Sequence, residues 1–381
     1  MARDINKRLT QLSARRKGLD RIDKINEAQA FDELVRKGTI AERWEKRAAS
    51  KPNTRYALGA MQAVDPDYTR ISVETAGRVA NQLEQGLIRK GTNVQFRLQG
   101  SVPLDIHIRG VSDVDLLTLT TDFFTYATYG ARARTGGYVN PSSKSALTVL
   151  AELRARCEVV LAEAFPKAEL DKTGGKAIAI SGGSLARPVD VVPSHWFDTV
   201  DFQASGDEAS RAVTILDKKV PTTLDNWPFL HIRNVDLVDS AVYGTLKKAI
   251  RLCKNVKADA KADGTDITLP SFDITSAMYH ADRQALTGGR LFELAILAET
   301  QRHLDHLATN IDYAKTLKVP DGSRAIFNTD DKIKGLVALS IEVDDLLREV
   351  AKEQNGYLAT LAEPALDVSR GVLKNLDASG L

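Results

Sequence analysis

The chain has 381 residues, which is long for one compact core, because single hydrophobic cores stop growing at roughly 250–300 residues. Its 52 lysines and arginines nearly balance 50 aspartates and glutamates, which excludes a protein held on nucleic acid or an acidic membrane by bulk charge. The two cysteines, Cys157 and Cys253, form no close-spaced pair, which excludes a disulfide framework or a zinc ligand set. With neither a leader nor a membrane span in the sequence, we expect a soluble cytoplasmic protein.

The first part of the chain predicts a lobe that mixes helices and strands. The first 50 or so residues are charged and weakly periodic, as in exposed helices, and an amphipathic helix is predicted from Ser72 to Gly91. The side chains then alternate over residues 94–98, as in a strand. The elements expected after it are a strand at 114–119, a helix at 144–165, strands at 177–180 and 188–192, and an SGGS turn at 181–184.

Beyond residue 205 the predicted elements are mostly helices, at 242–256, 275–280, 290–308 and 332–353. The connection around Ala204 to Gly206 is the expected boundary. We therefore predict two domains, an α/β core with N-terminal helices over residues 1–205 and a helical lobe over residues 206–381.

A pair of aspartates begins the predicted strand at 114–119. Asp113 and Asp115 are two residues apart, so on a strand both side chains project from one face, roughly 6–7 Å apart along the chain. Adjacent carboxylates repel each other unless cations lie between them. This is the arrangement of a two-metal phosphoryl-transfer site, in which Mg²⁺ or Mn²⁺ ions about 3.5–4 Å apart bind the attacking and leaving oxygens.

Two further motifs complete this hypothesis. Asp190 is the only charge after the proline of an otherwise apolar strand, and an unpaired buried charge is unfavourable, so it is expected to be the third metal ligand. Gly100 and Ser101 fit a turn whose amides and hydroxyl face a triphosphate. An exposed position or a strand-end cap is the alternative for any single aspartate, and the combination favours the metal site.

These residues carry a resemblance to a known family. QGS (99–101), SDVDLL (112–117) and PVDVVP (188–193) resemble motifs of the CD-NTases, the bacterial relatives of cyclic GMP-AMP synthase and oligoadenylate synthase. LHIRNVD (230–236), LKKAIRLCKNVK (246–257) and LPSFDITSAMYH (269–280) are similar to that family's helical-lobe signatures, in the same order. The resemblance covers approximately residues 75–285.

The resemblance implies roles for three residues of the second lobe. Lys254 matches the lysine that binds the donor triphosphate, whereas Lys247 and Lys248 are expected on a solvated basic face of the same helix. Ser271 matches a serine that contacts phosphate, and Phe272 an aromatic residue that stacks on a base. Base stacking contributes roughly 1–3 kcal/mol and tolerates any base, so Phe272 does not identify the nucleotide. Its alternative is an ordinary core phenylalanine.

The expected fold is α+β, a polymerase-β-like nucleotidyltransferase lobe with a mixed sheet plus an α-helical C-terminal lobe. The expected enzyme is Mg²⁺-dependent (or Mn²⁺-dependent) and uses Asp113, Asp115 and Asp190 to join nucleoside triphosphates without a template, releasing pyrophosphate. By the resemblance, the product is a cyclic oligonucleotide second messenger of anti-phage defence. The resemblance also implies a separate effector protein that senses the product, and a membrane-associated effector is compatible with it.

Two alternatives stay open. The same chemistry ends in a linear RNA or DNA oligomer in oligoadenylate synthases and in the Hailong defence systems. A catalytically inactive nucleotide-binding scaffold would have lost a carboxylate, and this chain keeps all three.

Overall fold

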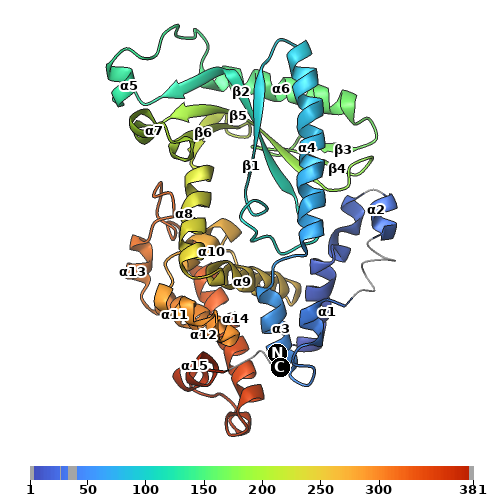
Figure 1. Cartoon of the computed structure of the whole chain (residues 1–381), viewed down its shortest axis with the longest axis vertical. Helices are drawn as coiled ribbons and strands as arrows, with labels where there is room; N and C mark the ends of the chain where they lie inside the picture. The colour runs from blue at the N-terminus through green and yellow to red at the C-terminus, as the bar shows by residue number, and fades with distance from the viewer. Residues whose placement is uncertain (1–3, 26, 33–40, 377–381) are drawn as a thin grey trace.

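The computed structural model describes residues 4–25, 27–32 and 41–376, which form two lobes stacked along the long axis of the molecule (Figure 1). One lobe is built on a mixed sheet and the other is helical. Helix α8 (Pro228–Ala241) leads from the first lobe into the second. The α+β class expected from the sequence is therefore confirmed.

The sheet lobe has seven strands in the order β1-β2-β5-β4-β3, with β6 paired to β5 and β7 to β6. Strands β2 and β5 are parallel and every other pair is antiparallel, so the sheet is mixed as predicted. The strands are β1 (Val94–Gln99), β2 (Val114–Tyr126), β3 (Glu169–Asp171), β4 (Ile178–Ser181), β5 (Val189–Asp198), β6 (Ala212–Asp217) and β7 (Thr222–Asn226). The helices of this lobe are α4 (Pro66–Arg89), α5 (Ala131–Arg134), α6 (Ala146–Ala164) and α7 (Val200–Ser205).

The two central strands are buried on both faces, because successive side chains of a strand point to opposite sides. Leu116 of β2 and Val191 of β5 belong to a hydrophobic cluster formed with α4 and α6. Leu117 and Val192 belong to a second cluster, against which Phe229 at the start of α8 packs. One face of the sheet is thus covered by its own helices, and the other faces the helix that enters the helical lobe.

The helical lobe is held by one large apolar core that also includes N-terminal helices. Its elements are α1 (Ile5–Arg16), α3 (Pro52–Met61), α8, α9 (Thr245–Ala262), α10 (Ser271–Met278), α11 (Arg283–Gly288), α12 (Glu293–Thr309), α13 (Ile311–Thr316), α14 (Asp330–Gln354) and α15 (Leu366–Lys374). The short helix α2 (Glu27–Asp32) follows α1 in the chain. Leu12 of α1 and Tyr56 of α3 are fully buried in this core, and α3 packs along α9 (Figure 1). The N-terminal helices therefore pack with the C-terminal lobe.

The sheet also continues past the boundary expected at residues 205–206. Strands β6 and β7 follow that point and pair with β5 and with each other, so residue 206 lies inside the sheet lobe. Strand β2 is longer than expected, because beyond Thr120 it becomes an exposed, alternating extension that still pairs with β5 after a bulge. The SGGS sequence forms the predicted turn between β4 and β5, with Gly182 and Gly183 at positive φ.

Candidate functional site

The structure brings the three predicted aspartates together at one end of β2 and β5. Asp115 and Asp190 are register partners on these parallel strands, and Asp113 immediately precedes β2. By the period of two, all three are on the same side as Leu117 and Val192, which is the face toward α8. The carboxylates therefore lie between the sheet and the helical lobe.

Gly100 is fitted against this cluster. It follows β1 at a φ of +82°, and a Cβ atom built there would collide with the carboxylate of Asp115. Only glycine combines this backbone conformation with the close approach. Ser101 begins the loop that returns to β2, and its carbonyl accepts a hydrogen bond from the amide of Ile106 at 3.0 Å.

Burial and mutual repulsion perturb two of the carboxyls. Burial, followed by the charges of Asp190 and Asp113, raises the pKa of Asp115 to about 7. Burial, followed by the charge of Asp113, raises the pKa of Asp190 to about 6, although Arg21 acts in the opposite direction. The pKa values of both carboxyls are raised because too little positive charge lies nearby to offset burial and repulsion. Such an environment is expected of a site that binds cations.

Asp113 makes an ion pair with a residue that the sequence analysis did not single out. Arg21 Nη1 lies 2.7 Å from Asp113 Oδ2. Arg21 belongs to a 3₁₀ helix, Leu19–Lys24, directly after α1. The charged character of the N-terminal segment was visible in the sequence, but its function was not readable, since nothing local connects residue 21 to residue 113.

Lys254 lies on the buried side of α9 beneath the loop that joins β1 to β2. Its ammonium donates to the carbonyl of Ile106 at 2.6 Å, and burial, followed by the charges of Arg109 and Arg251, lowers its pKa to about 8. Arg251 supports the same loop through the carbonyl of Asp105 at 2.6 Å. Lys254 thus contacts the loop between Gly100 and Asp113.

The surroundings of two neighbouring lysines on α9 differ from those predicted from the sequence. The Lys247 side chain is only 19% exposed, and it pairs with Asp236 at 2.8 Å. Lys248 pairs with Glu293, also at 2.8 Å. The charge periodicity of α9 could not indicate these partners, which come from α8 and α12.

Ser271 and Phe272 form the first turn of α10. The Phe272 ring is 42% exposed, stacks on His231 of α8 with ring centroids 4.5 Å apart, and has the Arg324 guanidinium 5.3 Å from its centroid. It is therefore not a core phenylalanine. The contacts described for these residues do not join them to the three aspartates.

Comparison with known proteins identifies the family. Residues 233–341 match the family model of the cGAS/DncV-like nucleotidyltransferase C-terminal helical domain. A cyclic dinucleotide synthase CdnE of Yersinia aleksiciae is 44% identical over 317 residues, which cover 83% of this chain and 82% of that protein. The chain belongs to the CD-NTase family. The resemblance noted in its sequence is confirmed.

Solved CD-NTase structures agree with the fold. A STING-associated CdnE c-di-GMP synthase of a Flavobacteriaceae species superposes with a TM-score of 0.72 at 23% identity, over 93% of this chain and 100% of that one. A STING-associated CdnE c-di-GMP synthase of Capnocytophaga granulosa superposes with a TM-score of 0.68 at 26% identity, over 90% and 97%. This CD-NTase is thus a nucleotidyltransferase of a family whose named relatives are cyclic nucleotide synthases.

The donor atoms of this CD-NTase fit a divalent metal. Three carboxylates supply the oxygen ligands that Mg²⁺ prefers, and glycine at position 100 lets the backbone approach the carboxylate of Asp115 closely. Over residues 4–25, 27–32 and 41–376, no three His, Cys, Asp or Glu side chains converge as a formed metal cluster. Asp113, one of the three proposed ligands, is paired with Arg21.

The membrane prediction was also tested on the described residues. None of the helices among them is both long enough and apolar enough to span a bilayer.

Proposed function

We propose that this CD-NTase joins two nucleoside triphosphates into a cyclic dinucleotide, with Mg²⁺ or Mn²⁺ as cofactor and pyrophosphate as leaving group. The observation that carries the proposal is the placement of Asp113, Asp115 and Asp190 on the face of the sheet toward the helical lobe. Phosphoryl transfer requires positioning and electrostatic stabilisation more than covalent chemistry. Three carboxylates at one end of two neighbouring strands, on the side toward the helical lobe, are suited to both.

In this proposal the three aspartates hold the metal, which would neutralise the triphosphate and acidify the attacking ribose hydroxyl. Gly100 and Ser101 lie at the turn nearest Asp115 and are proposed to bind the phosphates through backbone and hydroxyl groups. Lys254 is proposed to support the triphosphate from below the same loop, as the resemblance implies. Phe272, which is 42% exposed, is proposed to stack on a base, with Ser271 beside it.

The relatives support a cyclic rather than a linear product. The protein at 44% identity is named a cyclic dinucleotide synthase, and a 29% identical relative from Capnocytophaga granulosa is named a c-di-GMP synthase. The solved synthase from that organism is described as STING-associated. We therefore propose that the product acts in the cytoplasm on a separate effector protein that senses the cyclic dinucleotide during anti-phage defence.

Product analysis tests this proposal. The purified chain is incubated with all ribo- and deoxyribonucleoside triphosphates and Mg²⁺ or Mn²⁺, treated with phosphatase, and analysed by mass spectrometry. The expected result is one dominant mass of two nucleotides without free termini. A series of products that differ by one nucleotide each and carry a free terminal hydroxyl would show that the product is linear.

The aspartates provide the matched control. Asp113→Asn, Asp115→Asn and Asp190→Asn are each expected to lower turnover at least about 100-fold, because a neutral amide no longer balances the charge of the metal. Circular dichroism should show that each variant stays folded. If one of these variants incorporates labelled nucleotide at nearly the wild-type rate, that aspartate is not a metal ligand. If the wild-type protein forms no product, the alternative of a catalytically inactive scaffold is favoured.

A further inference from the structure

The ion pair between Arg21 and Asp113 joins the N-terminal segment to the candidate metal site. Its two side chains are partly open to solvent, Arg21 at 32% and Asp113 at 44%. We propose that Arg21 is the counter-cation of Asp113 in the metal-free protein and competes with the divalent metal for that carboxylate. This inference rests on the proposed function, since Arg21 can compete with a metal ion only if Asp113 binds that ion.

Several contacts place Arg21 at Asp113. Gly18, at a φ of +74°, packs so closely on Val111 that a Cβ atom would lie 2.7 Å from its Cγ2. The amide of Gly110 donates to the carbonyl of Arg15 at 3.0 Å. Asp20 pairs with Arg109 at 2.9 Å. The segment before Arg21 is thus attached to the residues immediately before Asp113.

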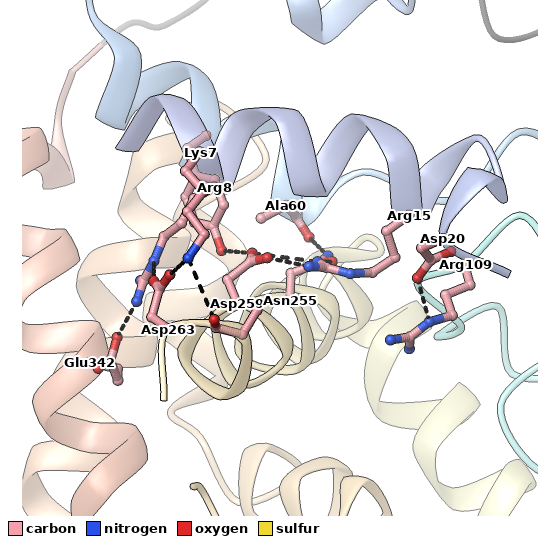
Figure 2. Close-up of polar contacts among 12 residues, drawn as sticks. Lys7, Arg8, Arg15, Asp20, Ala60, Arg109, Asn255, Asp259, Asp263 and Glu342 are labelled. Carbon is pink, nitrogen blue, oxygen red and sulfur yellow. Dashed lines mark hydrogen bonds and ion pairs between the residues drawn. The ribbon is translucent and has the colours of Figure 1, made fainter. Parts of the chain in front are cut away.

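Helix α1 anchors this segment to the helical lobe (Figure 2). Arg15 pairs with Asp259 and donates to Asn255 of α9 at 2.6 Å. Two turns earlier, Arg8 pairs with Asp263 at 2.8 Å and with Glu342 of α14 at 2.9 Å. These contacts are largely buried, so the position of Arg21 follows from the packing of α1 on the helical lobe.

A divalent metal ion can displace the Arg21 guanidinium from the carboxylate of Asp113. A guanidinium satisfies a carboxylate with one positive charge and directed hydrogen bonds, whereas a divalent ion brings twice the charge and contacts several carboxylates at once. Because ion pairs this exposed are weak, Arg21 can hold Asp113 in the resting protein without preventing metal binding.

The test measures Mn²⁺ binding to the full chain without nucleotide, by electron paramagnetic resonance of free Mn²⁺. Arg21→Ala and Arg21→Gln should each bind Mn²⁺ roughly two- to fivefold more tightly than wild type, the range for an exposed ion pair. The matched control is Lys24→Ala, which removes the same charge from the same exposed 3₁₀ segment. It should leave the affinity close to that of wild type.

The outcomes separate this inference from the proposed function. Unchanged or weaker Mn²⁺ binding by both Arg21 variants overturns the inference, as does an equal gain in Lys24→Ala, which would indicate a general field effect. The Asp113→Asn variant reports on the metal site itself. If it binds Mn²⁺ as well as wild type, the metal assignment fails; if it binds poorly while the Arg21 variants match wild type, the inference alone fails.

Discussion

The carboxyl of Asp115 lowers the stability of the folded protein when it is ionised. Its pKa is raised to about 7, by burial first and then by Asp190 and Asp113, so near neutral pH the folded protein holds a carboxyl that ionises less readily than in the unfolded chain. A group with a raised folded pKa contributes stability at low pH that is lost as the pH rises through that pKa. In metal-free protein, the contribution of Asp115 to the free energy of unfolding should therefore be smallest above about pH 7.

Asp115→Asn is expected to melt at a higher temperature than wild type at pH 8 in the presence of a chelator, because the amide carries no charge to bury. The difference should shrink at pH 5, where Asp115 is mostly protonated. Differential scanning calorimetry at both pH values checks this, with the exposed Glu84→Gln on α4 as control. A difference that is the same at both pH values contradicts the raised pKa of Asp115.

At the scale of elements, α9 supports the loop that carries the site. Lys254→Ala should weaken binding of a nonhydrolysable ATP analogue at least about tenfold, since a hydrogen bond to a charged group contributes roughly 1.5–3 kcal/mol. Lys261→Ala removes an exposed lysine of the same helix and should have little effect. Isothermal titration calorimetry measures both affinities.

Melting curves of the same variants separate the two roles of Lys254. If Lys254→Ala melts earlier yet binds the analogue like wild type, the lysine only holds the Ile106 carbonyl. Lys247 is unsuitable as a control, because its ion pair with Asp236 gives it a structural role.

Helix α10 presents an aromatic face at its first turn. Phe272→Tyr should retain most activity, whereas Phe272→Ala should raise the KM for nucleotide with a loss of roughly 1–3 kcal/mol of binding. Because the ring is 42% exposed, the alanine variant should melt within a few degrees of wild type. Steady-state kinetics beside a melting curve test this, and a large fall in melting temperature with unchanged KM would indicate packing on His231 instead.

At the scale of the whole molecule, a buried ionic network fastens α1 to α9 (Figure 2). Arg15 and Asp259 are almost fully buried, and burial raises the pKa of Asp259 even with Arg15 beside it. Removing Arg15 would leave that carboxyl without its cation, which is more unfavourable than the loss of an exposed pair.

We therefore expect Arg15→Met to lower the free energy of unfolding by about 3–5 kcal/mol. Lys7→Ala breaks another α1 to α9 pair, with Asp263, but Lys7 is half exposed and the loss should stay below about 1 kcal/mol. Urea unfolding measures both variants. Equal losses would mean that burial does not govern this network.

The sequence by itself determined what is encoded locally. The strands at 114–119 and 188–192 were predicted because an apolar run is a local pattern. The metal-site hypothesis followed from the carboxylates at the start of the first strand and within the second. The turn after Gly100 was visible for the same reason. The family resemblance added Lys254, Ser271 and Phe272, whose roles stay predictions.

Only the tertiary structure decided which distant residues meet. The pairing of β6 and β7 with the sheet, the packing of α1 on the helical lobe and the contact of Arg21 with Asp113 all join segments far apart in the chain. An ion pair between residues 21 and 113 leaves no periodicity in either segment, because its energy depends on geometry that exists only after both lobes have packed. The aspartates of the candidate site can therefore be found from local sequence patterns, whereas the cation that pairs with Asp113 is determined only by the packing of the whole fold.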